Sequence, residues 1–394
     1  MTGHIRKRGK RSWQIFLELP RTSDGRRRQK TVTVRGTKRQ AEAELARLTN
    51  EIATGAFVEP TTMTLSAFLD RWLADSAAIR VSAKTFERYE EIVRKHLVAA
   101  LGRIRLADLR PLHIQEYYAA ALRSGRLDGK GALSAQTVLH HHRILREALQ
   151  QAVRWQLLAR NPADAVEPPK PSRREMQVLD ETETAEVLAA IQDSRLRLAV
   201  FVAVTTGLRR GEVLALRWND IDLTEHRIYV NRTVEQTKRD IRVKEPKTAK
   251  GRRTVTIPPV LVKELKRYRT AQLKLRLQVG AEFNKDGLLF YNERGTLWRP
   301  SALTRAFSRV MTRRGGKYVR LHDLRHSHAT HLLRHDIHPK IVQERLGHSS
   351  FKLTMDTYTH VIPSLQEHAA QEVDAALTTA LERVKRRPRR RAPR

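Results

Sequence analysis

The sequence predicts a multidomain protein that is mainly α-helical and carries small β-sheets. Its 394 residues are enough for two or three domains with cores of their own. Helical apolar spacing dominates from residue 64 onward, whereas strand-like alternation is confined to the start of the chain and to residues 227–257. Two short proline-containing segments, 59–63 and 168–176, indicate linkers. We therefore expect domains at residues 1–58, 64–167 and 175–384, and a basic tail at 385–394.

Charge is the strongest compositional feature. The chain has 76 Lys and Arg against 42 Asp and Glu, a formal net charge of +34, which indicates a polyanionic partner such as nucleic acid. It has no cysteine, which excludes disulfides and thiol catalysis. No run approaches the roughly 20 apolar residues of a membrane span, and the start lacks the apolar core of a signal peptide. We expect a cytoplasmic protein with no membrane partner.

The first domain is predicted to be a small sheet packed on one helix. Apolar and polar residues alternate over 13–19, a turn follows at 22–25, and a second β run spans Thr31 to Val34. Residues 38–54 have helical spacing. Basic residues precede the first run and flank the turn. A β-ribbon edged with arginine can enter a DNA major groove, although a solvated charged face is the alternative. The candidate DNA-binding residues are Arg6, Arg8, Lys10, Arg26 and Arg28.

The second domain is predicted to be all helical. Its amphipathic segments are 65–73, 85–98, 111–122 and a long helix to about residue 158, for which Ser134 is a suitable N-cap. The adjacent histidines at 140–142 point in different directions, which argues against a metal site there. A helical module with basic faces can clamp a duplex. The candidate DNA-binding residues on these helices are Lys84, Arg88 and Arg146.

The third domain is predicted to mix helices with one small antiparallel sheet. The sheet would contain β runs around Ile228, Ile241 and Val255. Helices are expected over 179–191 with Asp180 or Thr182 as cap, over 195–206, 211–217 and 260–277, in the region that begins at Leu321, and over 369–384.

The stretch from Leu321 to Tyr358 concentrates chemically useful side chains. His322 and Arg325 are spaced i and i+3, so they share a helix face. His348 follows the Gly347 turn, and Tyr358 comes ten residues later. A cation, two imidazoles and a phenol suit chemistry at a phosphate, because they supply charge, proton transfer and a hydroxyl nucleophile.

Four segments carry a family resemblance. TTGLRRGEVLALRWNDID, LHDLRHSHAT, LGHSS and MDTYTHV occur in this order and resemble the conserved boxes of the tyrosine recombinases, the phage integrase family. By the same resemblance, residues 1–58 are similar to the three-stranded arm-type DNA-binding domain of integrases. Residues 64–167 are similar to their helical core-binding domain, and 175–384 to their mixed α+β catalytic domain.

The resemblance implies roles for individual residues. Arg209 and Arg325 would be the two catalytic arginines, because guanidinium forks bind phosphate oxygens bidentately. His322 and His348 would hydrogen-bond the scissile phosphate and assist proton transfer. Glu212 would orient catalytic groups. For the arginines and for Glu212, ordinary ion pairing is the alternative.

The nucleophile and the general acid are also assigned by resemblance. Tyr358 would be the nucleophile, with a core aromatic as the alternative; Tyr291 and Tyr318 lie outside the terminal box. Lys247 would be the general acid to the leaving 5′-oxygen. Nearby rivals for that role are Lys244 and Lys250. A zinc site at His322 and His326 would lack a clear third ligand.

The function implied is a site-specific recombinase, an integrase of a phage or other mobile element. It would cut and rejoin DNA through a 3′-phosphotyrosyl intermediate with no cofactor, since rejoining would need neither ATP nor metal. The implied partners are double-stranded DNA at core and arm sites, three further copies in a homotetramer, and a directionality factor or DNA-bending protein. The alternatives are a topoisomerase IB-like nicking and rejoining enzyme, or a DNA-binding regulator without catalysis.

Overall fold

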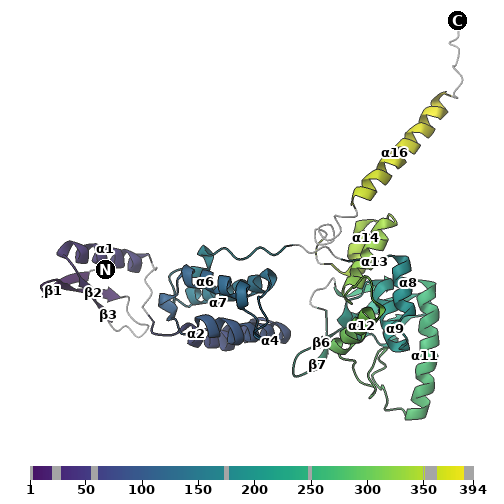
Figure 1. Ribbon diagram of the computed structural model, residues 1–394, viewed down its shortest axis with the longest axis horizontal. Coiled ribbons are helices and arrows are strands. Elements are labelled where there is room, and N and C mark those ends of the chain that lie inside the picture. Colours follow the sequence, from purple (N-terminus) through teal and green to yellow (C-terminus); the bar gives the residue numbers. More distant parts are fainter. Residues whose placement is uncertain are drawn as a thin grey trace, which may run out of the picture. The chain divides into compact units, whose positions relative to one another are not determined.

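The computed structural model describes residues 3–19, 28–54, 61–172, 177–246, 251–348, 350 and 362–385. The chain divides into two compact units, residues 1–173 and 174–394 (Figure 1). The division falls within the proline-rich segment 168–176. Most described residues are helical and the sheets are small and antiparallel, so the predicted fold class is confirmed. Within the described ranges, no helix is long and apolar enough to cross a membrane.

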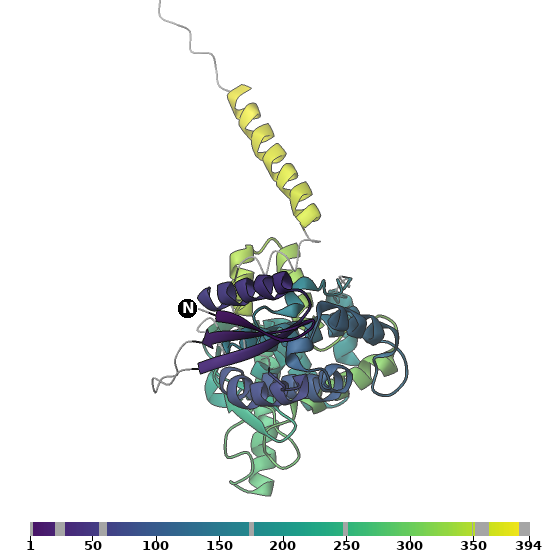
Figure 2. The ribbon, with the colours of Figure 1, turned by 90° about the vertical axis from the view of Figure 1, so that its left-hand side faces the viewer.

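The chain begins with a three-stranded antiparallel sheet in the order β1-β2-β3, with α1 along one face (Figures 1 and 2). Ile15 and Leu17 of the central strand are buried against Leu48 and Ile52 of the helix. Thr37 caps α1 in a reciprocal capping box with Gln40. The bounds are β1 Gly3–Gly9, β2 Ser12–Leu19, β3 Arg28–Arg35 and α1 Lys38–Ala53.

Strand β1 of this sheet was not predicted, because its residues show no clear apolar alternation. We expected Arg6 and Arg8 to precede the sheet, but both lie within β1. Only Ile5 of that strand packs on the core, so its alternation is masked by basic residues. The three-stranded sheet implied by the family resemblance is present.

Residues 61–172 form a helical bundle around their own core. Ser134 caps the long helix α7 by accepting from the Thr137 N–H, as expected. On the same helix, His141 and His142 are buried and hydrogen-bond the hydroxyls of Tyr117 and Tyr118. The bounds are α2 Leu65–Trp72, π-helical η1 Leu73–Ala77, α3 Ala78–Arg80, α4 Ala83–Ile92, π-helical η2 Val93–Leu97, α5 Val98–Leu101, 3₁₀ turn η3 Leu106–Asp108, α6 Pro111–Ser124, α7 Ala135–Arg154 and 3₁₀ turn η4 Pro162–Ala165.

The C-terminal unit is built around helix α9 (Ser194–Thr206), which is apolar on nearly every side and packs against α8, α10, α11, α12 and α13. The helix ends at Gly207, whose φ of +67° is left-handed. The other bounds are α8 Glu181–Ala189, α10 Arg210–Ala215, 3₁₀ turn η5 Trp218–Asp220, α11 Pro259–Val279, α12 Pro300–Arg314, α13 Asp323–Arg334, α14 Pro339–Leu346 and α16 Ile362–Lys385.

The prediction of one small sheet in this unit was wrong, because the strands form two. The run around Ile241 pairs not with the other two but with a strand that the sequence analysis missed, in a separate hairpin. The hairpin packs on α10. The first sheet has the order β4-β5-β8, with β4 Ile221–Asp222, β5 Arg227–Val230 and β8 Arg253–Thr256; the hairpin is β6 Thr233–Gln236 and β7 Ile241–Lys244.

Close packing of the hairpin on α10 generates a prediction for Gly211→Ala. Alanine favours helix formation, but its Cβ would lie 2.5 Å from the Thr233 hydroxyl oxygen and 2.7 Å from the Val234 carbonyl oxygen. We expect the clash to dominate and the free energy of unfolding to fall by about 1–3 kcal/mol. Urea unfolding measures the loss, and hydrogen exchange should localise it to α10 and β6.

Gly9→Ala is the control, because its Cβ would meet no atom closer than 3.9 Å. It should leave exchange in α10 and β6 unchanged. A Gly211→Ala protein as stable as the wild type would show that β6 can move away from α10 without cost.

Candidate active site

The centre of the site is the C-terminal end of α14. Gly347 takes a left-handed φ of +66°, and its N–H donates to the Glu344 carbonyl. The His348 N–H donates to the Gln343 carbonyl. This is a Schellman motif, which satisfies two of the carbonyls that a helix end leaves unpaired. The next three carbonyl oxygens, at residues 345–347, still need donors.

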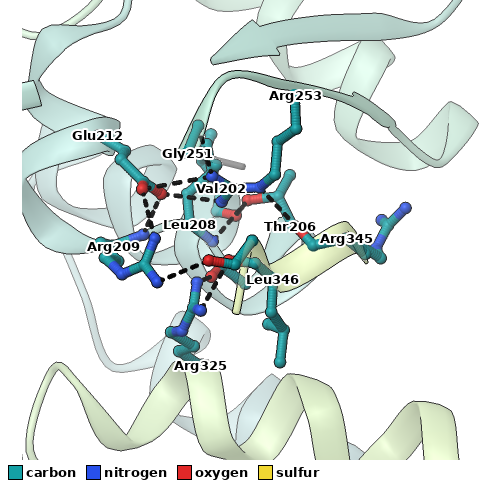
Figure 3. A network of polar contacts seen from close by, with 12 residues as sticks. Val202, Thr206, Leu208, Arg209, Glu212, Gly251, Arg253, Arg325, Arg345 and Leu346 are labelled. Atoms are coloured by element: carbon teal, nitrogen blue, oxygen red, sulfur yellow. Dashed lines mark hydrogen bonds and ion pairs between the residues drawn. The ribbon is translucent and has the colours of Figure 1, made fainter. Parts of the chain in front are cut away.

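Each of these three carbonyls accepts a hydrogen bond from an arginine on a different part of the C-terminal unit. We call this arrangement, residues 345–347 with their three arginines, the carbonyl cradle (Figure 3). The negative end of the α14 dipole favours cations at this position. The Arg253 Nε donates to the Arg345 carbonyl (2.7 Å), the Arg325 Nη2 to the Leu346 carbonyl (2.7 Å), and the Arg209 Nη2 to the Gly347 carbonyl (3.0 Å).

Glu212 lies between two arginines of the cradle (Figure 3). Its carboxylate accepts from the Arg209 Nη1 at 2.8 Å, from the Arg209 backbone N–H at 2.8 Å, and from the Arg253 Nη2 at 2.9 Å. Burial raises the pKa of Glu212, but hydrogen bonding and the charges of Arg253 and Arg209 outweigh it and lower the pKa below its ordinary value. Glu212 is therefore a buried carboxylate whose contacts hold two guanidiniums.

The two predicted imidazoles, His322 and His348, lie in the electrostatic field of the same arginines. Burial, reinforced by the charges of Arg325 and Arg209, lowers the pKa of His348 to about 3. His322 occupies the N-cap position of α13 and is solvent-exposed, yet partial desolvation and the Arg325 charge lower its pKa as well. Both rings are therefore neutral at pH 7 in the free protein.

The structure thus brings together Arg209, Glu212, His322, Arg325 and His348, five of the seven predicted site residues. They come from the N-cap and first turn of α10, from the N-cap and first turn of α13, and from the turn after α14. Lys247 and Tyr358 lie outside the described residues, as does the rival Lys250. Of the other rivals, Lys244 is ion-paired with Glu235, Tyr291 is buried, and Tyr318 is exposed with its hydroxyl 2.6 Å from that of Ser308.

The remaining histidines of this region have structural contacts. His326 stacks edge-on with His322 at a centroid distance of 5.2 Å, and His328 accepts from the Arg345 Nε at 3.0 Å. His331 hydrogen-bonds the Leu179 carbonyl, and His338 caps α14. In the part of the chain that the structure describes, no group of three or more potential ligands could hold a metal ion.

The candidate DNA-binding residues lie on two separate surfaces. Arg6 and Arg8 are exposed on β1. Alternation along the strand directs Arg6 to the side opposite Ile5, which packs on the core, whereas Arg8 lies where the strand register shifts between Lys7 and Gly9. Lys10 is exposed in the following turn. On the helical bundle the residues are exposed too, but Lys84 pairs with Glu87 and Arg146 with Asp164. Arg88 is exposed, Arg28 lies in β3, and Arg26 is outside the described residues.

Arg253 and Arg345 also belong to this cluster, although neither was predicted from the sequence. Arg253 occupies the same inward face of β8 as Val255, so the period-two pattern would have placed a cation against the core and required a buried acidic partner. Arg345 is half-buried on α14 and donates to His328 and to the Thr205 carbonyl, which ties α14 to α9 and α13. Helical spacing alone gives no comparable indication for Arg345.

Sequence profiles identify the family. A profile described as "Phage integrase family" matches residues 177–364, and a profile described as "Phage integrase, N-terminal SAM-like domain" matches residues 64–121. Together they cover more than half of the chain. The protein therefore belongs to the phage integrase family, the tyrosine recombinases, and is a recombinase that cuts and rejoins DNA.

Individual relatives span nearly the whole chain. It is 29% identical over 387 residues to a "Tyrosine recombinase XerC-like" protein of Caldanaerobacter subterraneus, covering 93% of this chain and 97% of that protein. It is 28% identical over 350 residues to the ICEBs1 integrase of Bacillus subtilis, covering 88% and 93%.

Solved structures share the fold. A Tn1549 transposon integrase in complex with transposon right end DNA matches with a TM-score of 0.64 and 21% identity, covering 78% of this chain and all of that one (100%). A lambda integrase dimer bound to a COC′ core site matches with a TM-score of 0.57 and 20% identity, covering 90% and 94%. At such identities these matches establish the fold of the chain.

The buried His328 generates a prediction about pH. Burial, with a further contribution from the Arg345 charge, lowers its pKa to about 3, whereas an unfolded histidine titrates near 6.5. The unfolded state therefore binds more protons between these two values, so stability is lost as pH falls below about 6.5, by at most about 1.4 kcal/mol per pH unit for this histidine. His328→Gln keeps an acceptor for Arg345. It should reduce the slope of the free energy of unfolding against pH by up to that amount, measured by urea unfolding between pH 6.5 and pH 4.5.

His335→Gln is the control, since that histidine is 72% exposed. Its free energy of unfolding should depend on pH with the same slope as that of the wild type. Equal slopes for His328→Gln and the wild type would show that His328 is not held neutral in the folded protein.

Proposed function

We propose that the protein is a site-specific integrase that joins the DNA of a phage or other mobile element to a bacterial chromosome through a phosphotyrosyl intermediate. The carbonyl cradle supports this most strongly, because it holds Arg209 and Arg325, the two arginines assigned to the scissile phosphate, against one helix end. Membership of the phage integrase family and similarity to integrases over most of the chain support it as well.

The two arginines act by electrostatics. Attack on a phosphodiester gives a pentacoordinate transition state with more charge on its non-bridging oxygens than the ground state has. Guanidiniums already fixed in place stabilise this charge without reorganising during the reaction. Because Arg209 and Arg325 are held by carbonyls and by Glu212, their geometry is set before DNA binds.

The proton transfers balance. The Tyr358 phenol, with an ordinary pKa of about 10, loses its proton to a neutral imidazole, His322 or His348, as its oxygen attacks phosphorus. The bond to the 5′-oxygen breaks, and Lys247 gives that oxygen a proton. The products are a 3′-phosphotyrosyl bond and a free 5′-hydroxyl. The reverse steps with a different 5′-hydroxyl rejoin the strand, with no ATP and no metal ion consumed.

The rest of the chain supplies binding and assembly. We propose that the sheet of residues 3–35 binds arm sites through Arg6, Arg8, Lys10, Arg26 and Arg28, and that the bundle of residues 61–172 binds core sites with Lys84, Arg88 and Arg146. Four copies assemble on two DNA sites in the bacterial cytoplasm, with a directionality factor or DNA-bending protein selecting the reaction. Domains at 1–58, 64–167 and 175–384 and a basic tail at 385–394 divide these tasks.

Tyr358→Phe tests the chemistry. The full chain is incubated with a pool of nicked synthetic duplexes of randomised sequence, from which a cleaved strand end can diffuse away so that covalent adducts accumulate. We expect the wild type to form an adduct that mass spectrometry maps to Tyr358. Tyr358→Phe should form none, because its ring has no oxygen to attack phosphorus, while its affinity for the recovered duplex is unchanged.

Tyr318→Phe is the matched control and should react like the wild type. An adduct on another tyrosine would overturn the assignment of Tyr358. DNA binding without any adduct would favour the regulator, and relaxation of supercoiled DNA by a monomer without pairing of two sites would favour the topoisomerase-like enzyme.

The N-terminal sheet generates a prediction about salt. The slope of log affinity against log salt concentration is negative, and replacing Arg6, Arg8 and Lys10 together by glutamine should reduce its magnitude by about 2.7, since each phosphate contact contributes about 0.9. Fluorescence anisotropy with a mixed-sequence duplex measures it. The control replaces Lys38, Arg39 and Arg47 on α1 by glutamine, which removes the same charge from the helix that covers the other face. Equal effects of the two triple variants would contradict an interface on the open face of the sheet.

A further inference from the structure

Arg253 is a buried cation outside the set of residues assigned to the scissile phosphate. Its side chain is only 7% exposed, and it lies on the inward face of β8. All three of its guanidinium nitrogens donate hydrogen bonds within the protein. An arginine buried in this way is expensive unless its partners are satisfied in return, so its contacts indicate what it does.

These contacts join Glu212 to the carbonyl cradle, and both of these hold the candidate catalytic residue Arg209. One edge of the guanidinium binds the Glu212 carboxylate, with Nη2 at 2.9 Å and Nη1 at 3.3 Å. The Nε binds the Arg345 carbonyl at 2.7 Å, the first acceptor of the carbonyl cradle. Glu212 and the cradle each hold Arg209 as well. Arg253 therefore joins the carboxylate and the helix end independently of Arg209, the residue that both of them orient (Figure 3).

We propose that Arg253 is a positioning residue for strand cleavage: it locks the Glu212 carboxylate against the end of α14 and thereby aims the Arg209 guanidinium at the scissile phosphate. The proposal rests on the proposed function. Arg253 acts through Glu212 and Arg209 and does not touch the DNA. Without this link, Glu212 could follow Arg209 away from the cradle, and the guanidinium would lose its fixed direction.

Only a planar fork can make these contacts together. A lysine ammonium is a point charge on a flexible stem and does not span a carboxylate and a backbone carbonyl in fixed geometry. Arg253→Lys therefore keeps the charge that Glu212 needs and removes the alignment. Since a misplacement of about 1 Å can reduce a rate by about 100-fold, we expect the single-turnover rate of adduct formation to fall by about that factor. Affinity for the same duplex should stay at the wild-type value.

A double-variant cycle with Glu212→Gln distinguishes positioning from a general loss of structure. If Arg253 works through Glu212, the double variant should cleave no more slowly than the slower single variant, because the second change removes a link already broken. Independent effects would multiply the two rate losses.

Arg232→Lys is the matched control. Arg232 also places its guanidinium on a buried carboxylate of the same unit, with its Nη2 2.6 and 2.7 Å from the oxygens of Asp220, but it has no contact with the cradle. It should reduce thermal stability about as much as Arg253→Lys while leaving the cleavage rate near that of the wild type.

The outcomes separate the two proposals. A wild-type protein that forms no adduct overturns the proposed function and, with it, the role of Arg253. A reactive wild type with Arg253→Lys cleaving at the same rate, or with multiplicative losses in the cycle, overturns the positioning role alone. A slow Arg253→Lys with full DNA affinity, a non-multiplicative cycle and a fast Arg232→Lys supports it.

Discussion

The C-terminal end of one short helix determines the geometry of the candidate active site. A helix end leaves carbonyl oxygens without partners, and here three in succession are paired with guanidiniums. Hydrogen bonds to charged groups are worth about 1.5–3 kcal/mol each, so the arrangement holds side chains as firmly as it caps the helix. The arginines come from the N-cap of α10, from β8 and from α13. A feature of helix termination thereby joins distant parts of the chain.

The same cluster gathers three positive charges at one helix end. The guanidiniums repel each other, and the Glu212 carboxylate reduces this repulsion because it binds both Arg209 and Arg253. The positive potential of the cluster has two consequences. It adds to burial, the larger cause, in lowering the pKa of the nearby His322 and His348, and it favours binding of an anion such as a phosphodiester. A cluster of guanidiniums with this potential is consistent with a site for DNA.

Much of the fold could be predicted from periodicity and capping residues. Ser134 and Asp180 cap the helices expected of them, and the apolar run after Arg195 forms the buried central helix. Pairing between strands was less predictable. The run around Ile241 looks like its neighbours in composition, yet it pairs in a separate hairpin, because partner choice depends on packing against α10. Strand β1 escaped because its exposed basic residues hide the alternation.

For the site, local sequence determined which chemical groups are available and, by resemblance to a family, which of them to examine. His322 and Arg325 are neighbours on one helical turn, and Glu212 is three residues from Arg209, so their proximity was readable directly. Only the tertiary structure decided that Arg209, Arg325 and Arg253 converge on the end of α14. Contacts across 138, 21 and 92 residues of chain depend on how helices and strands pack, and no local pattern encodes that packing.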